Sequence, residues 1–170
     1  MTYIDIYVSC LQFSLWNDVL NYRDISYISF SNQGFIYFMI NIYSNSSQSA
    51  LKYLKDTKSN IHNVITMTGE FNIRDSIWGS NFPFYSSHSD FLFDITDLFS
   101  LDISKPLKNV PTRFSDNDHK TNSVLDLVFL CPSFPEFNCY CIHPNWRLSL
   151  DHALITIKVS IHKERISHIW

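Results

Sequence analysis

The feature of this sequence that most limits its fold is a series of β-type runs, each with a short polar cluster at its end or inside it. The three clusters are Gly69-Glu70-Phe71-Asn72 after Val64–Thr68, Ser123-Val124-Leu125-Asp126 at the start of the run to Leu130, and Asp151-His152 before Ala153–Val159. Because strand ends direct several side chains into one crevice, acidic and amide groups at these positions favour a sheet with a metal or phosphate site at one edge.

The remaining periodicity predicts a mixed α/β domain. Two β-rich runs flank Ser31-Asn32-Gln33-Gly34, where glycine can supply the positive φ of a hairpin turn. Apolar residues at helical spacing predict one helix capped by Ser46 or Ser47 and a second capped by Ser87 or Ser89. Since hairpins outnumber helical crossovers, mainly antiparallel pairing is expected. Further strands are predicted at Tyr3–Val8, near Thr112, at Cys139–His143 and at Ala153–Ile161.

Length and composition are those of one folded domain. The chain has 170 residues and is 45% hydrophobic, which is enough to bury a core and argues against disorder. Its longest apolar stretch is far shorter than the ~20 residues of a membrane span, so no membrane association is expected. No secretory signal pattern opens the chain, and an intracellular location is expected. The four cysteines are interpreted as buried or idle thiols, with a zinc site that includes His143 as the alternative, for which no second ligand pair has the usual spacing.

The charge balance does not favour tight binding to nucleic acid. Sixteen acidic residues face 13 lysines and arginines, giving a net charge of −3. Phosphate contacts from basic side chains supply most non-specific affinity for DNA, so a nuclease with this composition would need a local basic rim. The scattered candidates for that rim are Lys105, Lys108, Arg113, Lys120 and Arg147.

Taken together and in this order, the clusters resemble the endonuclease/exonuclease/phosphatase superfamily, and within it the endonuclease domain of non-LTR retrotransposons. The pattern of that family is a Gly-Asp-Phe-Asn turn, then Pro-Thr-Arg-Phe, Ser-x-Leu-Asp-Leu-x-Phe and Ser-Asp-His. The matching stretches here are Asn41–Ser44, Gly69–Ile73, Pro111–Phe114, Ser123–Phe129 and Leu150–Ala153. The resemblance, which extends from about Tyr3 to Ile161, implies an α/β (α+β) fold with a two-sheet β-sandwich flanked by helices.

The resemblance implies that the first cluster acts on water and phosphate. Glu70 would orient or deprotonate the attacking water, and Asn72 would donate a hydrogen bond to the phosphate. Glu70 stands where the family has Asp, so its carboxylate lies farther out by on the order of 1 Å, a displacement that can cost ~10²-fold in rate. Without the other clusters, Glu70 would be interpreted as a solvated carboxylate in a turn.

The other clusters are expected to supply an oriented histidine and a metal ligand. Asp126 stands between two leucines in an apolar strand, where an unpaired buried carboxylate would be costly, so it needs a partner. By resemblance that partner is His152, whose charged ring would hold the scissile phosphate. Asp151 would contact Mg²⁺ or its bound water. Tyr43 and Thr112 are expected near the phosphate, although ordinary β packing would also explain a strand tyrosine or threonine.

The resemblance also implies an incomplete domain. In the family, strands that precede the matched region carry a Glu that is the principal magnesium ligand, and Met1–Ile4 aligns just after it. We therefore expect residues 1–162 to form an incomplete, N-terminally truncated domain with weak Mg²⁺ binding, and residues 163–170 to form a frayed tail. Leu150 replaces the family's Ser and removes one hydroxyl from the site.

Two functions follow as hypotheses. The first is a metal-dependent phosphodiesterase of the endonuclease type that acts on DNA, with a reverse transcriptase region as its partner in a full-length element. Its activity would be impaired by loss of the metal-binding Glu. The second is a catalytically inactive relic or interaction module of the same fold. A third branch of the superfamily acts on phosphoinositides or sphingomyelin, but Pro111–Phe114 and Ser123–Phe129 favour the retrotransposon branch.

Overall fold

A computed structural model describes residues 13–14, 22–32, 34–58, 61–79, 85–104, 110–115, 122–133, 137–147 and 151–159. The strands are β1 (Phe13–Ser14), β2 (Ile25–Asn32), β3 (Phe35–Tyr43), β4 (Val64–Glu70), β5 (Asp102–Ile103), β6 (Asp126–Leu130), β7 (Phe137–Arg147) and β8 (Ala153–Val159). The helices are α1 (Ser49–Thr57), the 3₁₀ turn η2 (Ser76–Trp78) and α2 (Ser87–Leu98). The strand predicted at Tyr3–Val8, Leu150 and the tail 163–170 lie outside the described residues.

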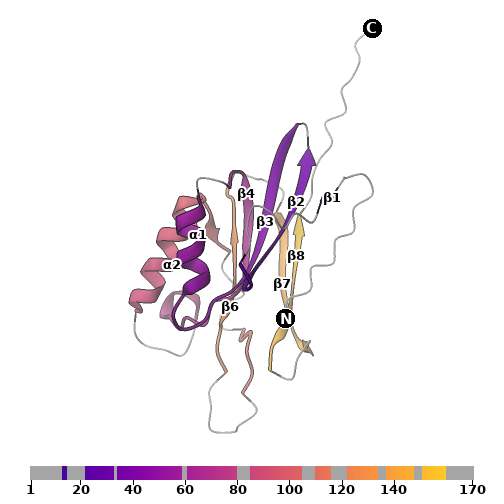
Figure 1. Ribbon diagram of the computed structural model, residues 1–170. Helices are drawn as coiled ribbons and strands as arrows, with labels where there is room; N and C mark the ends of the chain where they lie inside the picture. Colours follow the sequence, from indigo (N-terminus) through magenta and orange to yellow (C-terminus); the bar gives the residue numbers. More distant parts are fainter. Residues whose placement is uncertain are drawn as a thin grey trace.

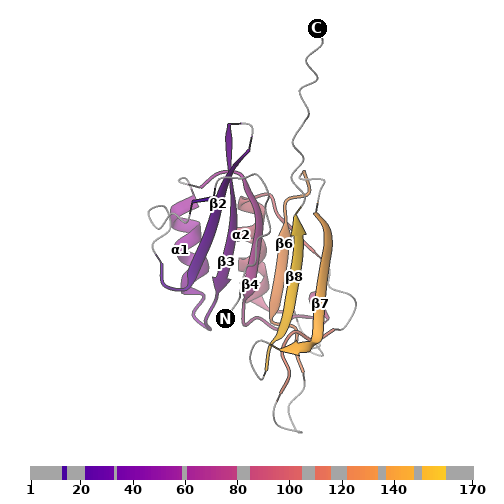
Figure 2. The same cartoon turned by 90° about the vertical axis from the view of Figure 1, so that its right-hand side faces the viewer.

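The strands form two sheets. Six of them pair in the order β1-β2-β3-β4-β6-β5, and β7 and β8 form a separate hairpin. Within the large sheet only β3 and β4 are parallel, with α1 as their crossover, so the expectation of mainly antiparallel pairing is confirmed. Figure 1 shows three layers, with the helices on one side of the large sheet and β7–β8 on the other. Figure 2 shows the β7–β8 hairpin from the front.

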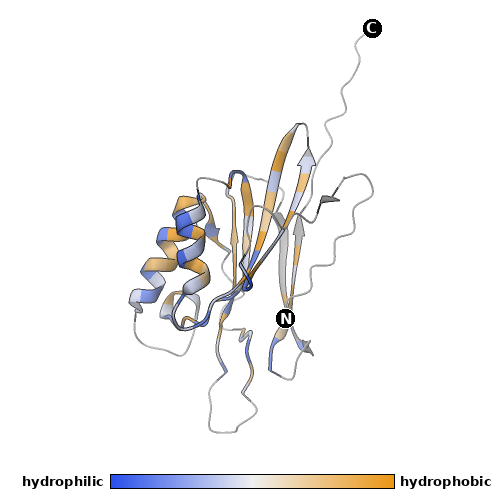
Figure 3. Ribbon diagram, viewed as in Figure 1, coloured by the Kyte–Doolittle hydropathy of each residue, from blue (hydrophilic) through white to orange (hydrophobic). Residues whose placement is uncertain are grey.

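The core lies between the helices and the large sheet. Each helix presents a buried apolar stripe, with Leu51 and Leu54 on α1 and Leu92 and Ile95 on α2 all fully buried. Polar and apolar residues alternate along both helices, as Figure 3 shows by colour. Burying one such side chain contributes about 1.5–3 kcal/mol. These contacts hold the helices against the sheet and leave its strand ends for the polar clusters.

The predicted helices exist, but their predicted caps are wrong. The helix α1 begins after Gln48, which has a left-handed φ of 54°, and the Asn45 side chain accepts the hydrogen bond from the Ser49 N–H at 3.4 Å. The helix α2 is capped by Ser86, whose side chain accepts the His88 N–H. Several polar residues precede each helix, so the pattern located the helices more precisely than their caps.

Gly34 has the turn role that the sequence predicts, whereas Gly69, expected in a turn after the strand, lies within β4. Gly34 has a φ of 80° in the turn between β2 and β3. Gly69 has a φ of 143° and lies so close to β3 that a Cβ atom would stand 1.8 Å from the carbonyl oxygen of Ile42. Only glycine permits this approach of two strand backbones. Gly69 therefore fixes the end of β4, where Glu70 follows.

Candidate active site

Three of the predicted site residues come from neighbouring strand ends. Glu70 ends β4 and is paired in register with Tyr43 at the end of β3 and with Asp126 at the start of β6. Directly opposite residues of an antiparallel pair, such as Glu70 and Asp126, have Cα atoms about 4.5–5.5 Å apart. The side chains of Glu70 and Asp126 are both partly buried, at 19% and 15% exposed. The sheet register therefore explains why residues far apart in sequence meet here.

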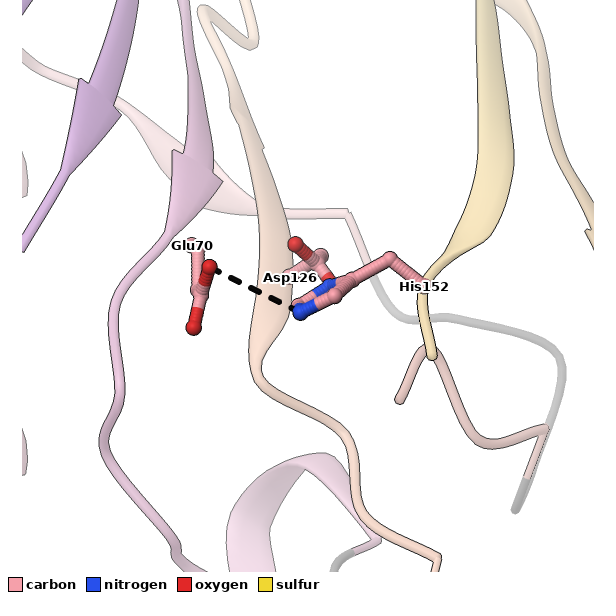
Figure 4. A group of neighbouring side chains, drawn as sticks. All are labelled: Glu70, Asp126 and His152. Atoms are coloured by element: carbon pink, nitrogen blue, oxygen red, sulfur yellow. Dashed lines mark hydrogen bonds and ion pairs between the residues drawn. The ribbon is translucent and has the colours of Figure 1, made fainter. Parts of the chain in front are cut away.

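His152 reaches this edge from the second sheet. It precedes β8, and its Nδ1 lies 3.0 Å from Oδ2 of Asp126, so that the ring N–H donates to the carboxylate. Its other nitrogen, Nε2, lies 3.7 Å from Oε2 of Glu70 and 3.8 Å from Oδ2 of Asp151. Figure 4 shows the His152 ring between the Asp126 and Glu70 carboxylates. One imidazole therefore faces three carboxylates.

The neighbouring carboxylates raise the pKa of His152 above its ordinary value. The hydrogen bond to Asp126 is the largest cause, and the charges of Asp126, Glu70 and Asp151 add to it, while partial burial of the ring acts in the opposite direction. The imidazolium form is therefore favoured, with Nδ1–H engaged by Asp126 and Nε2–H directed toward the acidic pair.

Arg113 supplies a second positive charge beside the cluster. Its Nε lies 3.5 Å from Oδ2 of Asp151, and its side chain is 42% exposed. Arg113 also forms isolated β-bridges with Ser123 and with His152. With His152 protonated, two cations then face three carboxylates, so the cluster keeps a net negative charge.

Asn72 lies in the turn after β4. Its φ is 54°, and its side-chain amide donates to the carbonyl oxygen of Ser44 at 3.0 Å. The preceding residue, Phe71, is fully buried and donates its N–H to the carbonyl oxygen of Leu125 at 2.9 Å. The turn is thus held on both sides, with Asn72 near the end of β3.

The two residues expected to support a phosphate differ in exposure. Tyr43 is 49% exposed at the site edge, whereas Thr112 is completely buried. The Thr112 hydroxyl oxygen accepts hydrogen bonds from the backbone N–H groups of Leu125 and Asp126, both at 3.0 Å. The predicted phosphate contacts of Tyr43 and Thr112 stay predictions.

The cluster has donor atoms suited to a cation. One ligand atom each from Glu70, Asp126 and His152 lie within 4.8 Å of one another. Carboxylate oxygens are the ligands that Mg²⁺ takes, commonly from one or two residues with water completing the shell. In the imidazolium form both nitrogens of His152 carry protons, so a cation would be held by carboxylate oxygens, among them those of Glu70 and Asp151, which lie 3.7 and 3.8 Å from Nε2. The carboxylates of this cluster fit a divalent cation.

One structurally important residue was not singled out from the sequence. Asp75 is fully buried, and its carboxylate accepts hydrogen bonds from the Ile77 N–H at 2.9 Å, the Ser86 N–H at 2.9 Å and the Ser89 hydroxyl at 2.6 Å. It ties the loop after Asn72 to the start of α2. The available signal was an Asp directly before a short helical turn, which is common at caps.

Comparison with known proteins agrees with this geometry. The family model described as endonuclease-reverse transcriptase matches residues 37–156. Among solved structures, the endonuclease domain of TRAS1, a telomere-specific non-LTR retrotransposon, superposes with a TM-score of 0.70 at 16% identity, covering 90% of this chain and 69% of that one. No curated protein matches the sequence.

These findings confirm the resemblance on which the sequence interpretation was based. The structural match establishes the shared fold, a mixed α/β arrangement of two sheets with helices. Within the described residues, no helix has the length and hydropathy required to cross a membrane. The family model spans the whole candidate site, from the strand that ends at Tyr43 to the start of β8 after His152. The chain belongs to the endonuclease-reverse transcriptase family.

Proposed function

We propose that this chain is a metal-dependent phosphodiesterase domain that cleaves DNA, in association with a reverse transcriptase. The observation that carries the proposal is the His152 ring, held at Nδ1 by Asp126 and facing Glu70 and Asp151 with Nε2. An oriented imidazolium beside carboxylates is suited to phosphodiester hydrolysis, which needs a base, a donor to the phosphate and a cation. The family match and the retrotransposon origin of the structural relative support DNA as substrate.

Each residue has a chemical task in this proposal. Glu70 accepts the proton of the attacking water, and the Nε2–H of His152 donates to a phosphoryl oxygen as negative charge develops there. Asp126 accepts the Nδ1–H bond and so orients the imidazolium with Nε2–H toward the phosphate, and the Asn72 amide offers a further donor. Asp151 and Glu70 would hold Mg²⁺, which neutralises charge on the phosphate when bound. The weak Mg²⁺ binding expected from the sequence stays a prediction.

A cation is required on electrostatic grounds. Among the described side chains of the cluster, the three carboxylates outnumber the positive charges of His152 and Arg113, so this cluster repels an anionic phosphodiester. A divalent ion reverses that balance. Nicking should therefore be absent in EDTA and appear with added Mg²⁺.

A second candidate, an inactive domain of the same fold, is favoured by one observation. The Glu70 carboxylate already lies 3.7 Å from Nε2 of His152, in the space where the proposal places a phosphoryl oxygen. A substrate would have to displace this carboxylate.

The test is a plasmid-nicking assay of the parent chain with Mg²⁺, beside His152→Ala and the control His62→Ala. His62 is exposed on the loop before β4, outside the cluster. Loss of one donor to the charge that develops in the transition state costs typically ~10²–10³-fold. The proposal expects nicking by the parent and by His62→Ala, and a loss of at least about 10²-fold in His152→Ala.

The same assay separates the alternatives. Equal nicking by all three proteins identifies a contaminating nuclease and contradicts the assignment of His152. No nicking by any of them, with folding confirmed by circular dichroism, supports the inactive domain.

A further inference from the structure

Thr112 has an unusual set of contacts for a residue expected to touch a phosphate. Its side chain has no exposure to solvent, and its hydroxyl oxygen accepts two backbone hydrogen bonds, from Leu125 and Asp126, at 3.0 Å each. Two donors fill the lone pairs of a hydroxyl oxygen. Both acceptor positions of the Thr112 hydroxyl oxygen are therefore occupied by backbone N–H groups at the start of β6.

The backbone of Thr112 bonds to the two segments that carry the Asp126–His152 pair. Its N–H donates to the carbonyl oxygen of Ser123 at 3.1 Å, and its own carbonyl oxygen accepts the Ala153 N–H at 2.8 Å. The residues that follow extend this connection, because Arg113 bridges to His152 and the Phe114 N–H donates to the carbonyl oxygen of Asp151 at 2.7 Å. One short segment thus joins the strand that begins at Asp126 to the strand that follows His152.

This connection crosses between the two sheets. Asp126 belongs to the large sheet and His152 precedes a strand of the small one, and no ladder joins β6 to β8 among the described strands. The 3.0 Å separation of Oδ2 and Nδ1 therefore depends on what holds the two strand ends together. Thr112 contacts both ends, with its hydroxyl on one side and its carbonyl on the other.

We propose that Thr112 is a positioning residue for the Asp126–His152 pair, acting through its buried hydroxyl, rather than a contact to the phosphate. The hydroxyl oxygen fixes the backbone of Asp126 relative to the segment that anchors Ala153. Its loss would shift the carboxylate against the imidazole, and a misplacement of about 1 Å can cost ~10²-fold in rate. The kinetic part of this inference rests on the proposed function, whereas the geometric part does not.

The test compares Thr112→Val, which keeps the shape and removes the oxygen, with Thr112→Ser, which keeps the oxygen. The first measurement needs no substrate and is made in EDTA: the proton resonance of His152 Nδ1–H, which is seen far downfield only while the proton is bonded to Asp126 and protected from water. The proposal expects this resonance in the parent and in Thr112→Ser, and its loss in Thr112→Val. An unchanged resonance in a folded Thr112→Val overturns it.

The second measurement is steady-state nicking. A positioning role predicts a fall in kcat of about 10- to 100-fold for Thr112→Val, with KM within about threefold of the parent and recovery in Thr112→Ser. A rise in KM with kcat unchanged identifies a phosphate contact and overturns the proposal. Absence of nicking by the parent defeats the proposed function, and the resonance then decides the positioning role alone.

A parent-protein measurement covers the case in which Thr112→Val does not fold. Amide hydrogen exchange of Leu125 and Asp126 reports directly on the two bonds that the hydroxyl accepts. Slow exchange of both amides, together with the downfield resonance in Thr112→Ser, supports the proposal. Exchange of the Asp126 amide at the rate of an unprotected amide overturns it.

Discussion

The close approach of Gly69 to β3 makes the substitution Gly69→Ala the sharpest test of the site architecture. An alanine Cβ would stand 1.8 Å from the Ile42 carbonyl oxygen and 2.7 Å from its carbonyl carbon, and both atoms are backbone. No rotamer change relieves such a contact, so the two parallel strands would have to separate. The φ of 143° adds strain because L residues rarely adopt it.

The expected cost follows from these two effects. Overpacking costs typically about 1–3 kcal/mol, and a strained backbone conformation costs a further ~1–3 kcal/mol. We therefore expect Gly69→Ala to lower the free energy of unfolding by about 2–6 kcal/mol, a large share of the ~5–15 kcal/mol typical of a domain. Any folded fraction should nick DNA more slowly, since Glu70 follows directly.

Urea denaturation followed by circular dichroism measures this cost, and Gly34→Ala is the matched control. Gly34 also has a positive φ, 80°, but a Cβ there would meet no atom within 4 Å. Strain alone should then cost about 1–2 kcal/mol. The reasoning fails if Gly69→Ala and Gly34→Ala lose equal stability, because the backbone contact at Ile42 would then contribute nothing.

Three further predictions follow from the site and the core. The pKa of His152 is raised in the folded state, so its protonation stabilises the fold fully below the unfolded pKa of about 6.5, and this stabilisation is lost as pH rises through the higher folded pKa. Urea titrations in EDTA should show this fall in stability, and the fall should be smaller in Asp126→Asn; parallel curves for the two proteins would contradict the prediction. Burial alone would raise the pKa of Asp75, but hydrogen bonds from Ser89 and from neighbouring backbone N–H groups outweigh burial and lower the pKa, so the stability of the fold should fall as pH drops through that pKa. Asp75→Asn should cost about 1–3 kcal/mol at pH 7 by urea denaturation, and equal stability of parent and variant would contradict this. Phe71 is fully buried, and its ring centroid lies 5.6 Å from that of Phe129 in an edge-on contact. Phe71→Ala should cost about 3–5 kcal/mol in the same assay, and a loss under 1 kcal/mol would be evidence against its place in the core.

The sequence predicted the strands that carry the site better than the contacts between them. Alternation and polar clusters located β4, β6 and β8, because burial of one strand face leaves a periodic pattern. The need of Asp126 for a partner also followed from its two leucine neighbours. The short strands β1 and β5, of two residues each, leave no such pattern and were not predicted.

Other details depend on tertiary contacts that no local pattern records. The Thr112 hydroxyl oxygen accepts two backbone bonds from a segment that follows it by more than ten residues. The buried hydrogen bonds of Asp75 likewise join residues up to 14 positions apart. Such contacts are set by how the chain packs, and only the neighbouring apolar residues appear in the periodicity.

The bond between Asp126 and His152 spans two hydrogen-bonded ladders that are separate from each other. Proteins open in cooperative units smaller than the whole molecule, and two such ladders are natural candidates for separate units. A fluctuation that parts β7–β8 from β6 would remove the imidazole while every helix stayed folded. Any nicking activity would then be lost by this local opening rather than by global unfolding. It would disappear at a lower denaturant concentration than the circular dichroism signal of α1 and α2.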